Sequence, residues 1–372
     1  MEIANFGVEE WLNVWEKRAK FDIAQSSIEA LTVAELIGLD GSSVADYFDA
    51  RSEMLLDYGW IEGSDDFKRE VAKIYRTLGP ENILQTNGAT GANLLALYAL
   101  IKPGDHVIST VPSYQQLYDI PRSLGADVTL IRLREEDEWG LNLGELARAI
   151  RPDTKMITLN SANNPTGALL DRKTLLEVVE IAKTSGAYVL VDEVYAPLAD
   201  DGEFWSIADL CDRGIATNSL SKTYSVPGIR IGWTAASEEL TDDFRKYRDY
   251  TMICGGVLQD EMAVHALRNR DKILARNRAI VARNHKILLD WVDSEPRVSL
   301  VAPNYVSTSF IKFDIPIDDH TFCVNLLEDT GVLLVPGSAF DVPGHARVGY
   351  CCSEDVLIQG LARLSQYLRR FD

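Results

Sequence analysis

A lysine accompanied by hydroxyl groups and an arginine is the clearest chemical signal in the chain. Lys222 closes the run Ser219-Leu220-Ser221-Lys222, and Arg230 follows it by eight residues. A lysine amine can condense with an aldehyde, and the two serine hydroxyls and the forked guanidinium can bind a phosphate beside it. A lone lysine is usually an exposed surface residue. The spacing of these groups instead favours a covalent site for an aldehyde that carries a phosphate.

Polar residues also follow two predicted strands. Asp192 and Tyr195 come directly after the apolar run at residues 188–191, and Asn164 follows a strand expected at residues 156–159. Open α/β sheets bind ligands at the carboxyl ends of their strands. An ionised Asp192 can pair with a protonated pyridine nitrogen, and Tyr195 and Asn164 can reach a ring hydroxyl. Taken alone, Asp192 is equally well a helix N-cap and Asn164 a turn residue.

Three further positions suit other parts of such a ligand. The run Gly-Ala-Thr-Gly at residues 88–91 lies between a strand and a helix, where backbone N–H groups can close on a phosphate. Tyr114 can stack on an aromatic ring or be an ordinary core tyrosine. Arg347 can bind a carboxylate or be a solvated strand residue. Each of these signals is weak by itself.

The elements expected around these residues alternate between strands and helices. Strands are predicted at residues 83–84, 107–108, 128–131, 156–159 and 188–191, and helices at 92–101 and after an N-cap at Asp171. This alternation favours a mainly parallel sheet. Farther on, residues 260–293 have a helical period, residues 307–313 alternate like a half-exposed strand, and residues 332–335 and 347–350 are predicted to be short strands. The sequence predicts a large domain at residues 45–260 and a small domain made of residues 1–44 and 261–372.

Composition excludes several classes of function. The 372 residues carry 37 basic and 56 acidic side chains, for a net charge of −19. We therefore expect no nucleic-acid partner, because such a partner requires a basic face, and no membrane partner. The five histidines and five cysteines show no HExxH or CxxC spacing, so no metal site is expected, and no GxSxG run indicates a serine hydrolase. Without a signal peptide, a cytoplasmic location is predicted.

Taken in order, these motifs resemble those of the class I/II aminotransferases, enzymes of fold type I that depend on pyridoxal 5'-phosphate (PLP). The matching positions run from Tyr58 to Arg347. The resemblance implies an α/β fold, with a three-layer α/β/α large domain around a mainly parallel sheet and a smaller α+β domain. It implies PLP as cofactor, an amino acid and a 2-oxo acid as substrates, and a homodimer with shared active sites.

The resemblance also assigns roles. Lys222 is expected to hold PLP as a Schiff base and to move the substrate proton, with Asp192 and Tyr195 as the other catalytic residues. The expected cofactor-binding residues are Ala89, Thr90, Tyr114, Asn164, Asp192, Tyr195, Ser219, Lys222 and Arg230, together with Tyr58 of the neighbouring subunit. Ser221 is expected to assist. Arg347 and Asn164 are expected to bind the substrate.

The motifs leave the reaction itself open. Transamination through Lys222 is the first interpretation. A PLP-dependent lyase or cyclase is the alternative, either by β-elimination or by cyclisation of the kind performed by capreomycidine synthase-like members of the family, which other segments of the chain resemble. A PLP-binding transcription factor is disfavoured because the segment before Tyr58 is too short and acidic for a DNA-binding domain. The stretch at residues 21–27 lacks the family's usual Gly-x-Pro turn, which leaves the substrate undetermined.

Overall fold

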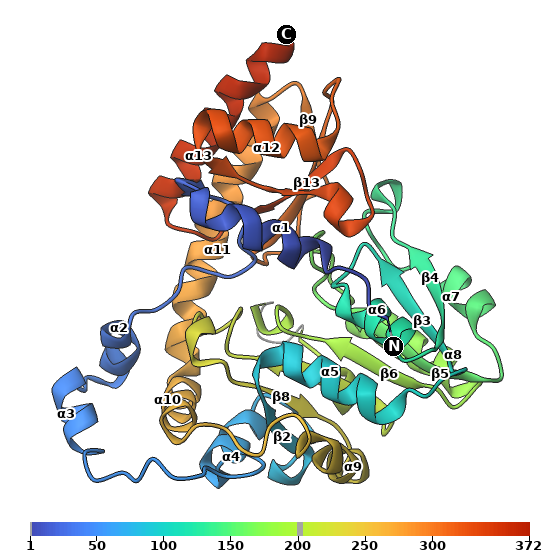
Figure 1. The fold of residues 1–372 in the computed structure, drawn as a ribbon, viewed down its shortest axis with the longest axis vertical. Coiled ribbons are helices and arrows are strands. Elements are labelled where there is room, and N and C mark those ends of the chain that lie inside the picture. The colour runs from blue at the N-terminus through green and yellow to red at the C-terminus, as the bar shows by residue number, and fades with distance from the viewer. Residues whose placement is uncertain (1, 199–203) are drawn as a thin grey trace.

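The computed structural model describes residues 2–198 and 204–372 and contains a seven-stranded central sheet (Figure 1). The strand order is β2 (Ile83–Thr86), β8 (Gly232–Ala235), β7 (Gly214–Ser219), β6 (Tyr188–Asp192), β5 (Thr154–Asn160), β3 (His106–Val111) and β4 (Asp127–Arg132). All pairs are parallel except those that β8 makes with its two neighbours. The expected α/β fold with a mainly parallel sheet is confirmed.

Helices cover both faces of this sheet. Consecutive strand residues point to opposite faces, and Met156 and Ile157 of β5, like Leu190 and Val191 of β6, belong to two different apolar clusters. One cluster packs under α5 (Gly88–Leu100), α6 (Gln116–Ser123) and α9 (Glu238–Arg248). The other packs under α4 (Asp65–Ala72), α7 (Leu143–Ala149), α8 (Arg172–Lys183) and α10 (Val257–Arg268). The arrangement is therefore three layers.

Two helices of this part of the chain start near the residues that the sequence predicts. The helix expected at residues 92–101 begins earlier, at Gly88, so the run that suggested a turn forms the first turn of α5. Gly88, the first residue of α5, has a positive φ of 67°, which costs glycine little. The N-cap predicted at Asp171 is confirmed, since its carboxylate accepts a hydrogen bond from the Thr174 N–H at 2.7 Å.

The C-terminal part forms a second, antiparallel sheet. Its strand order is β12 (Val335–Pro336), β13 (His345–Gly349), β10 (Thr308–Phe313) and β9 (Val298–Leu300). The helices here are α11 (Arg270–Ser294), α12 (Asp319–Thr330) and α13 (Glu354–Leu368). The N-terminal segment joins them: α1 (Gly7–Trp15) packs against this part, and β1 (Phe21–Asp22) pairs with β11 (Val332–Leu333). The exact domain boundaries stay a prediction.

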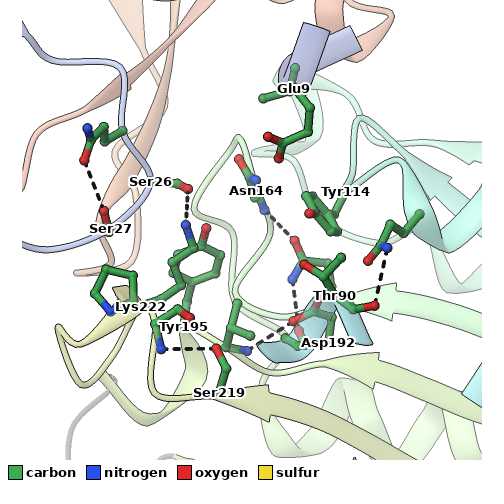
Figure 2. A pocket seen from close by; sticks show the side chains of 18 of the residues that line it. Glu9, Ser26, Ser27, Thr90, Tyr114, Asn164, Asp192, Tyr195, Ser219 and Lys222 are labelled. Carbon is green, nitrogen blue, oxygen red and sulfur yellow. Dashed lines mark hydrogen bonds between the residues drawn. The ribbon is translucent and has the colours of Figure 1, made fainter. Parts of the chain in front are cut away.

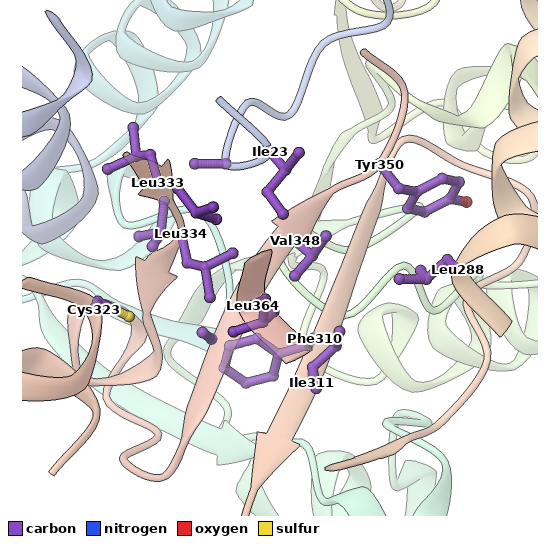
Figure 3. Packing of buried hydrophobic residues seen from close by; sticks show 14 of the residues in the cluster. Ile23, Leu288, Phe310, Ile311, Cys323, Leu333, Leu334, Val348, Tyr350 and Leu364 are labelled. Carbon is purple, nitrogen blue, oxygen red and sulfur yellow. The ribbon is translucent and has the colours of Figure 1, made fainter. Parts of the chain in front are cut away.

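Packing in this second core corrects two expectations (Figure 3). The strand β10 is not half-exposed: its residues are buried except Lys312, because Trp139 packs against Phe310 on one side while Ile311 faces the other residues of the core. The strand expected at residues 332–335 is instead two short strands, β11 and β12, which belong to different sheets. The sequence pattern is apolar throughout and carries no sign of this division.

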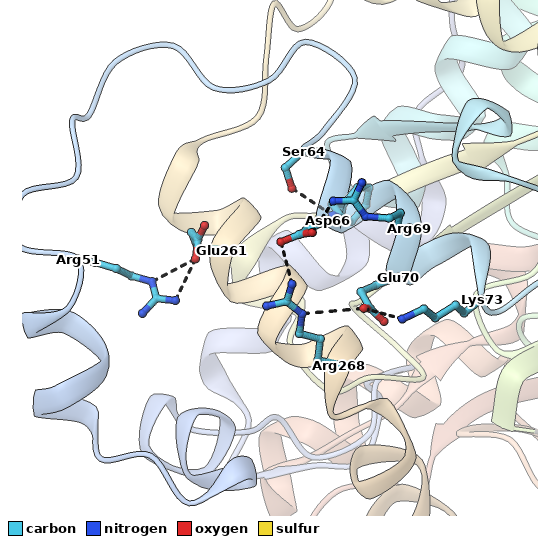
Figure 4. Close-up of polar contacts among 9 residues, drawn as sticks. Arg51, Ser64, Asp66, Arg69, Glu70, Lys73, Glu261 and Arg268 are labelled. Atoms are coloured by element: carbon cyan, nitrogen blue, oxygen red, sulfur yellow. Dashed lines mark hydrogen bonds and ion pairs between the residues drawn. The ribbon is translucent and has the colours of Figure 1, made fainter.

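Between β1 and α4 the chain runs through α2 (Val33–Ile37), α3 (Val44–Asp49) and an extended arm, residues 50–63, at the edge of the molecule (Figure 1). Arg51 at the start of the arm pairs with Glu261 of α10 at 2.9 Å, and neighbouring ion pairs join α4 to α10 (Figure 4). Leu55, Leu56 and Tyr58 of the arm are 80, 76 and 79% exposed. Within the described residues, no helix combines the length and apolar character required to cross a bilayer.

Candidate active site

A cavity of about 640 Å³ lies between the carboxyl edge of the central sheet, α1 and β13 (Figure 2). Every predicted site residue except Tyr58 lines it: Ala89, Thr90, Tyr114, Asn164, Asp192, Tyr195, Ser219, Ser221, Lys222, Arg230 and Arg347. Tyr58 lies on the exposed arm, outside the cavity of its own chain. The fold thus gathers residues that lie up to 258 positions apart in the sequence.

Lys222 follows β7 and projects its amine into the cavity. Burial, assisted by the nearby cation of Arg347, lowers the pKa of this amine to about 8. Its Nζ donates a hydrogen bond to the hydroxyl of Ser26 at 2.8 Å. A lysine with this pKa is partly neutral near neutral pH, as a nucleophile and a base require.

The first turn of α5 forms a site for a phosphate. The N-terminus of this 13-residue helix presents Ala89 and Thr90 to the cavity, beside Ser219 and Arg230. A Cβ on Gly88 would lie 2.6 Å from Nη2 of Arg230, so glycine lets the guanidinium close over the helix end. Free backbone N–H groups, the helix dipole and an arginine together fit a phosphate dianion.

Asp192 ends β6 and is a buried residue of the cavity lining. Its carboxylate accepts hydrogen bonds from Nδ2 of Asn93 at 2.7 Å and from the Val194 N–H at 3.3 Å. Burial raises the pKa of Asp192 to about 6, although the bond from Asn93 opposes the rise. A buried carboxylate that is ionised at neutral pH suits a cationic partner such as a protonated pyridine nitrogen. No α-helix starts at Asp192, so the N-cap alternative is wrong.

Aromatic and amide groups surround the same space. The ring of Tyr114 packs against Phe6, with centroids 5.1 Å apart, and both line the cavity. Burial raises the pKa of Tyr195 to about 12, so its phenol keeps its proton and can donate it in a hydrogen bond. The amide oxygen of Asn164 accepts from Nη1 of Arg347 at 3.1 Å. These groups can contact the face and the hydroxyl of an aromatic ring.

Arg347 is 2% exposed, so the alternative of a solvated strand residue is wrong. Its Nε and Nη2 donate to the carbonyl of Ala24 at 3.1 and 2.8 Å, and its Nη1 donates to Asn164. A guanidinium has five N–H donors, which leaves two for a ligand. The remaining donors suit a carboxylate, the group that this buried cation can hold with least cost.

Two cavity residues, Ser26 and Glu9, and the Asp192 partner Asn93 belong to no motif that the sequence reveals. Asn93 gives a weak signal, as the one polar residue in an apolar run at residues 92–101. Ser26 is recognisable only as part of a loop, and nothing in the sequence connects it with Lys222. Glu9 of α1 directs its carboxylate into the cavity near Tyr114 (Figure 2). Such long-range contacts leave no local pattern to read.

Comparison with known proteins agrees with this geometry. The family model described as aminotransferase class I and II matches residues 43–364. The chain belongs to this family. A PLP-dependent aminotransferase from Streptococcus suis 89-1591 is 54% identical, with a TM-score of 0.98 over 100% of this chain and 99% of its own.

Two other relatives are named as a synthase and a cyclase and not as aminotransferases. Capreomycidine synthase of Streptomyces vinaceus is 28% identical over 363 residues, which are 97% of this chain and 93% of the relative. The PLP-dependent cyclase OrfR is 26% identical, with a TM-score of 0.90 over 100% of this chain and 98% of its own. The family and these neighbours identify PLP as the cofactor, and the phosphate site, the lysine and the buried carboxylate fit it.

Proposed function

We propose that this protein is a PLP-dependent aminotransferase that moves an amino group between an L-amino acid and a 2-oxo acid. The observation that carries the proposal is the arrangement of two anion-binding sites around one lysine. Arg230 and the start of α5 suit the cofactor phosphate, and Arg347 suits the carboxylate that both substrates share. Lys222 lines the cavity together with both.

The chain's own residues divide the work. Lys222 would hold the cofactor covalently, Asp192 would keep its ring nitrogen protonated, and Ala89, Thr90, Ser219 and Arg230 would bind its phosphate. Bound PLP supplies an electron sink for the charge that develops at the substrate Cα. The Lys222 amine, with a pKa of about 8, is suited to take that Cα proton and return it, because a base works best when its pKa lies near the working pH.

The binding residues favour the same reaction. Arg347 would fix the α-carboxylate with the two donors that Ala24 and Asn164 leave available. Tyr195 and Asn164 would hold the ring hydroxyl oxygen, and Tyr114 would stack on the ring. Fixing the carboxylate and the ring together would restrict which bond at Cα can break, and holding the reacting groups in a productive orientation lowers the barrier.

The test is a single half-reaction. The purified holoenzyme is mixed with one amino acid at a time, without any 2-oxo acid, and products are measured by chromatography. Release of one equivalent of the matching 2-oxo acid per site, followed by a stop until an acceptor is added, is the expected result. Continuous release of product together with ammonia would contradict transamination. Lys222→Ala is the control and should release no 2-oxo acid beyond background.

A lyase or cyclase activity is the second candidate, and two relatives favour it. Capreomycidine synthase and the cyclase OrfR both match nearly the whole chain. Such reactions would use the same lysine and the same carboxylate site, and they would differ in which group leaves the substrate. The half-reaction described above separates them, because they turn over repeatedly without an acceptor.

We also propose a homodimer whose arm, residues 50–63, completes the neighbouring active site. The arm exposes Leu55, Leu56 and Tyr58 almost fully, and apolar surface of this kind is typical of an interface. Beside the phosphate site, a second hollow of about 280 Å³ is lined by Thr90, Arg230 and Met252. Tyr58 of the partner subunit entering this hollow would reach the cofactor phosphate. Size-exclusion chromatography with light scattering tests the dimer.

A further inference from the structure

The hydroxyl of Ser26 lies in the active-site cavity and contacts its lysine (Figure 2). Nζ of Lys222 donates to Oγ of Ser26 at 2.8 Å. The serine is 9% exposed. The two residues are 196 positions apart, so this contact exists only because the N-terminal segment folds back over the central sheet.

The loop that carries Ser26 is anchored through its backbone. The carbonyl of Ala24 accepts two hydrogen bonds from Arg347, at 2.8 and 3.1 Å. The carbonyl of Ser26 accepts one from the hydroxyl of Ser307 at 2.6 Å. None of these bonds uses the Ser26 side chain. Its hydroxyl is therefore placed rigidly, and removing it leaves the anchors of the loop intact.

The hydroxyl also interacts with Tyr195. Burial raises the pKa of Tyr195 to about 12, and a hydrogen bond from Ser26 acts in the opposite direction. A donor to the phenol oxygen has this effect because it stabilises the phenolate form. The hydroxyl of Ser26 thus accepts an N–H from Lys222 and also influences the phenol of Tyr195.

We propose that Ser26 is a positioning residue that holds the free amine of Lys222 in place for proton transfer. A hydroxyl that accepts one N–H fixes the amine but leaves its lone pair available to take a proton. The ammonium group that results can keep the same bond. The nature of the substrate that gives the proton rests on the proposed function, whereas the contact between Ser26 and Lys222 does not.

Four charged groups face the amine from the surrounding elements. Arg347 on β13 and Arg230 disfavour its charged form, while Glu9 on α1 and Asp192 at the end of β6 favour it. None of the four makes a hydrogen bond to Nζ in the part of the chain that the structure describes; Ser26 does. Removal of the Ser26 hydroxyl would therefore leave the amine without its direct partner while these four charges stay in place.

The first measurement is a titration of Lys222 in the full-length chain freed of cofactor. Acetylation of Lys222 by acetic anhydride is followed against pH by peptide mass spectrometry. We expect Ser26→Ala to lower the apparent pKa of the amine by about one unit, because the ammonium form loses its hydrogen-bond acceptor. Ser26→Thr keeps a hydroxyl and should restore the value.

Ser27→Ala is the matched control. Ser27 lines the same cavity, but its hydroxyl donates to Oε1 of Gln25 at 3.4 Å rather than serving the lysine. This variant should titrate like the unchanged protein. An unaltered pKa in Ser26→Ala, or an equal shift in Ser27→Ala, would overturn the assignment.

The second measurement uses the holoenzyme. Exchange of the amino-acid Cα–H for deuterium, followed by NMR in D2O, reports proton removal whatever product forms later. We expect Ser26→Ala to lower kcat for exchange by about 10-fold to 100-fold and to change KM by less than about twofold, because Arg347 still binds the carboxylate. An increase in KM with an unchanged kcat would contradict a positioning role. The titration reads the amine alone, so the role of Ser26 can be tested even if the transamination proposal fails.

Discussion

The bond between Asn93 and Asp192 sets the charge of the carboxylate that would face the cofactor nitrogen. Asn93 donates to Asp192 at 2.7 Å in a buried setting, and Thr217 in turn donates to Oδ1 of Asn93 at 2.6 Å. The pKa of Asp192 is about 6 with this bond present. We predict that Asn93→Ala raises the pKa of Asp192 and weakens PLP binding near neutral pH.

The magnitude follows from the strength of the bond. A hydrogen bond to a charged group contributes about 1.5–3 kcal/mol, and each pKa unit corresponds to about 1.4 kcal/mol. Loss of the bond should therefore raise the pKa by roughly one to two units. For a rise of about 1.5 units, the middle of this range, the ionised fraction of Asp192 at pH 7 would fall from about nine-tenths to about a quarter. PLP affinity at pH 7 should then fall about fourfold, with a larger loss at pH 6 and almost none at pH 9.

The assay is the dissociation constant of PLP for the full-length chain, measured by fluorescence from pH 6 to pH 9. The ratio of variant to unchanged protein at each pH cancels the titration of the cofactor itself. Thr217→Val is the control, because it removes the neighbouring bond but keeps Asn93 on Asp192, and its ratio should vary much less with pH. A ratio for Asn93→Ala that is the same at every pH would refute the reasoning.

Three other predictions concern the phosphate site, a buried acid and the subunit arm. A Cβ on Gly232 would lie 2.4 Å from the first turn of α5, so Gly232→Ala should weaken PLP binding at least about 10-fold. Gly228→Ala is the control: its Cβ would meet no atom within 4 Å, and this variant should bind PLP normally. Burial raises the pKa of Glu193 to about 8 from 4.5. Between these two pH values the folded chain keeps a proton on Glu193 that the unfolded chain releases. The stability of the fold should therefore fall as pH rises from about 4.5 to 8. The measurement is the melting temperature against pH, and Glu193→Gln should make its decline with rising pH less steep. An equal decline in the variant and the unchanged protein would contradict this prediction. Hybrid dimers of one Tyr58→Ala chain and one Lys222→Ala chain should be more active than either variant alone. If the sites are shared, one of the two sites in the hybrid contains both Lys222 and Tyr58. Hybrid activity no higher than half that of the Tyr58→Ala dimer would argue against a shared site.

The chemistry of the site was readable from the sequence because its motifs are local. Ser219 ends β7, and Ser221 and Lys222 follow it within three residues. Asp192 ends an apolar strand whose composition marks it as buried. Residues at the carboxyl ends of parallel strands must meet at one edge of the sheet. That these residues meet at one edge follows without knowledge of the strand order.

Other features depended on contacts between distant segments. The apolar run at residues 332–335 divides between two sheets because its first half pairs with β1 and its second half pairs with β13. The pattern at residues 308–313 suggested a half-exposed strand because alternation reports only the side chains of one strand and says nothing of what covers them. Trp139, far away in the chain, covers it.

What the sequence by itself determined is the class of fold and the cofactor, since a set of short local motifs in a fixed order indicates both. Only the tertiary structure placed Ser26 on Lys222 and Asn93 on Asp192, and it alone showed that Arg347 is buried. The protonation of the site is likewise decided by the tertiary structure, because a pKa depends on burial and on neighbours that the folding of the whole chain brings together.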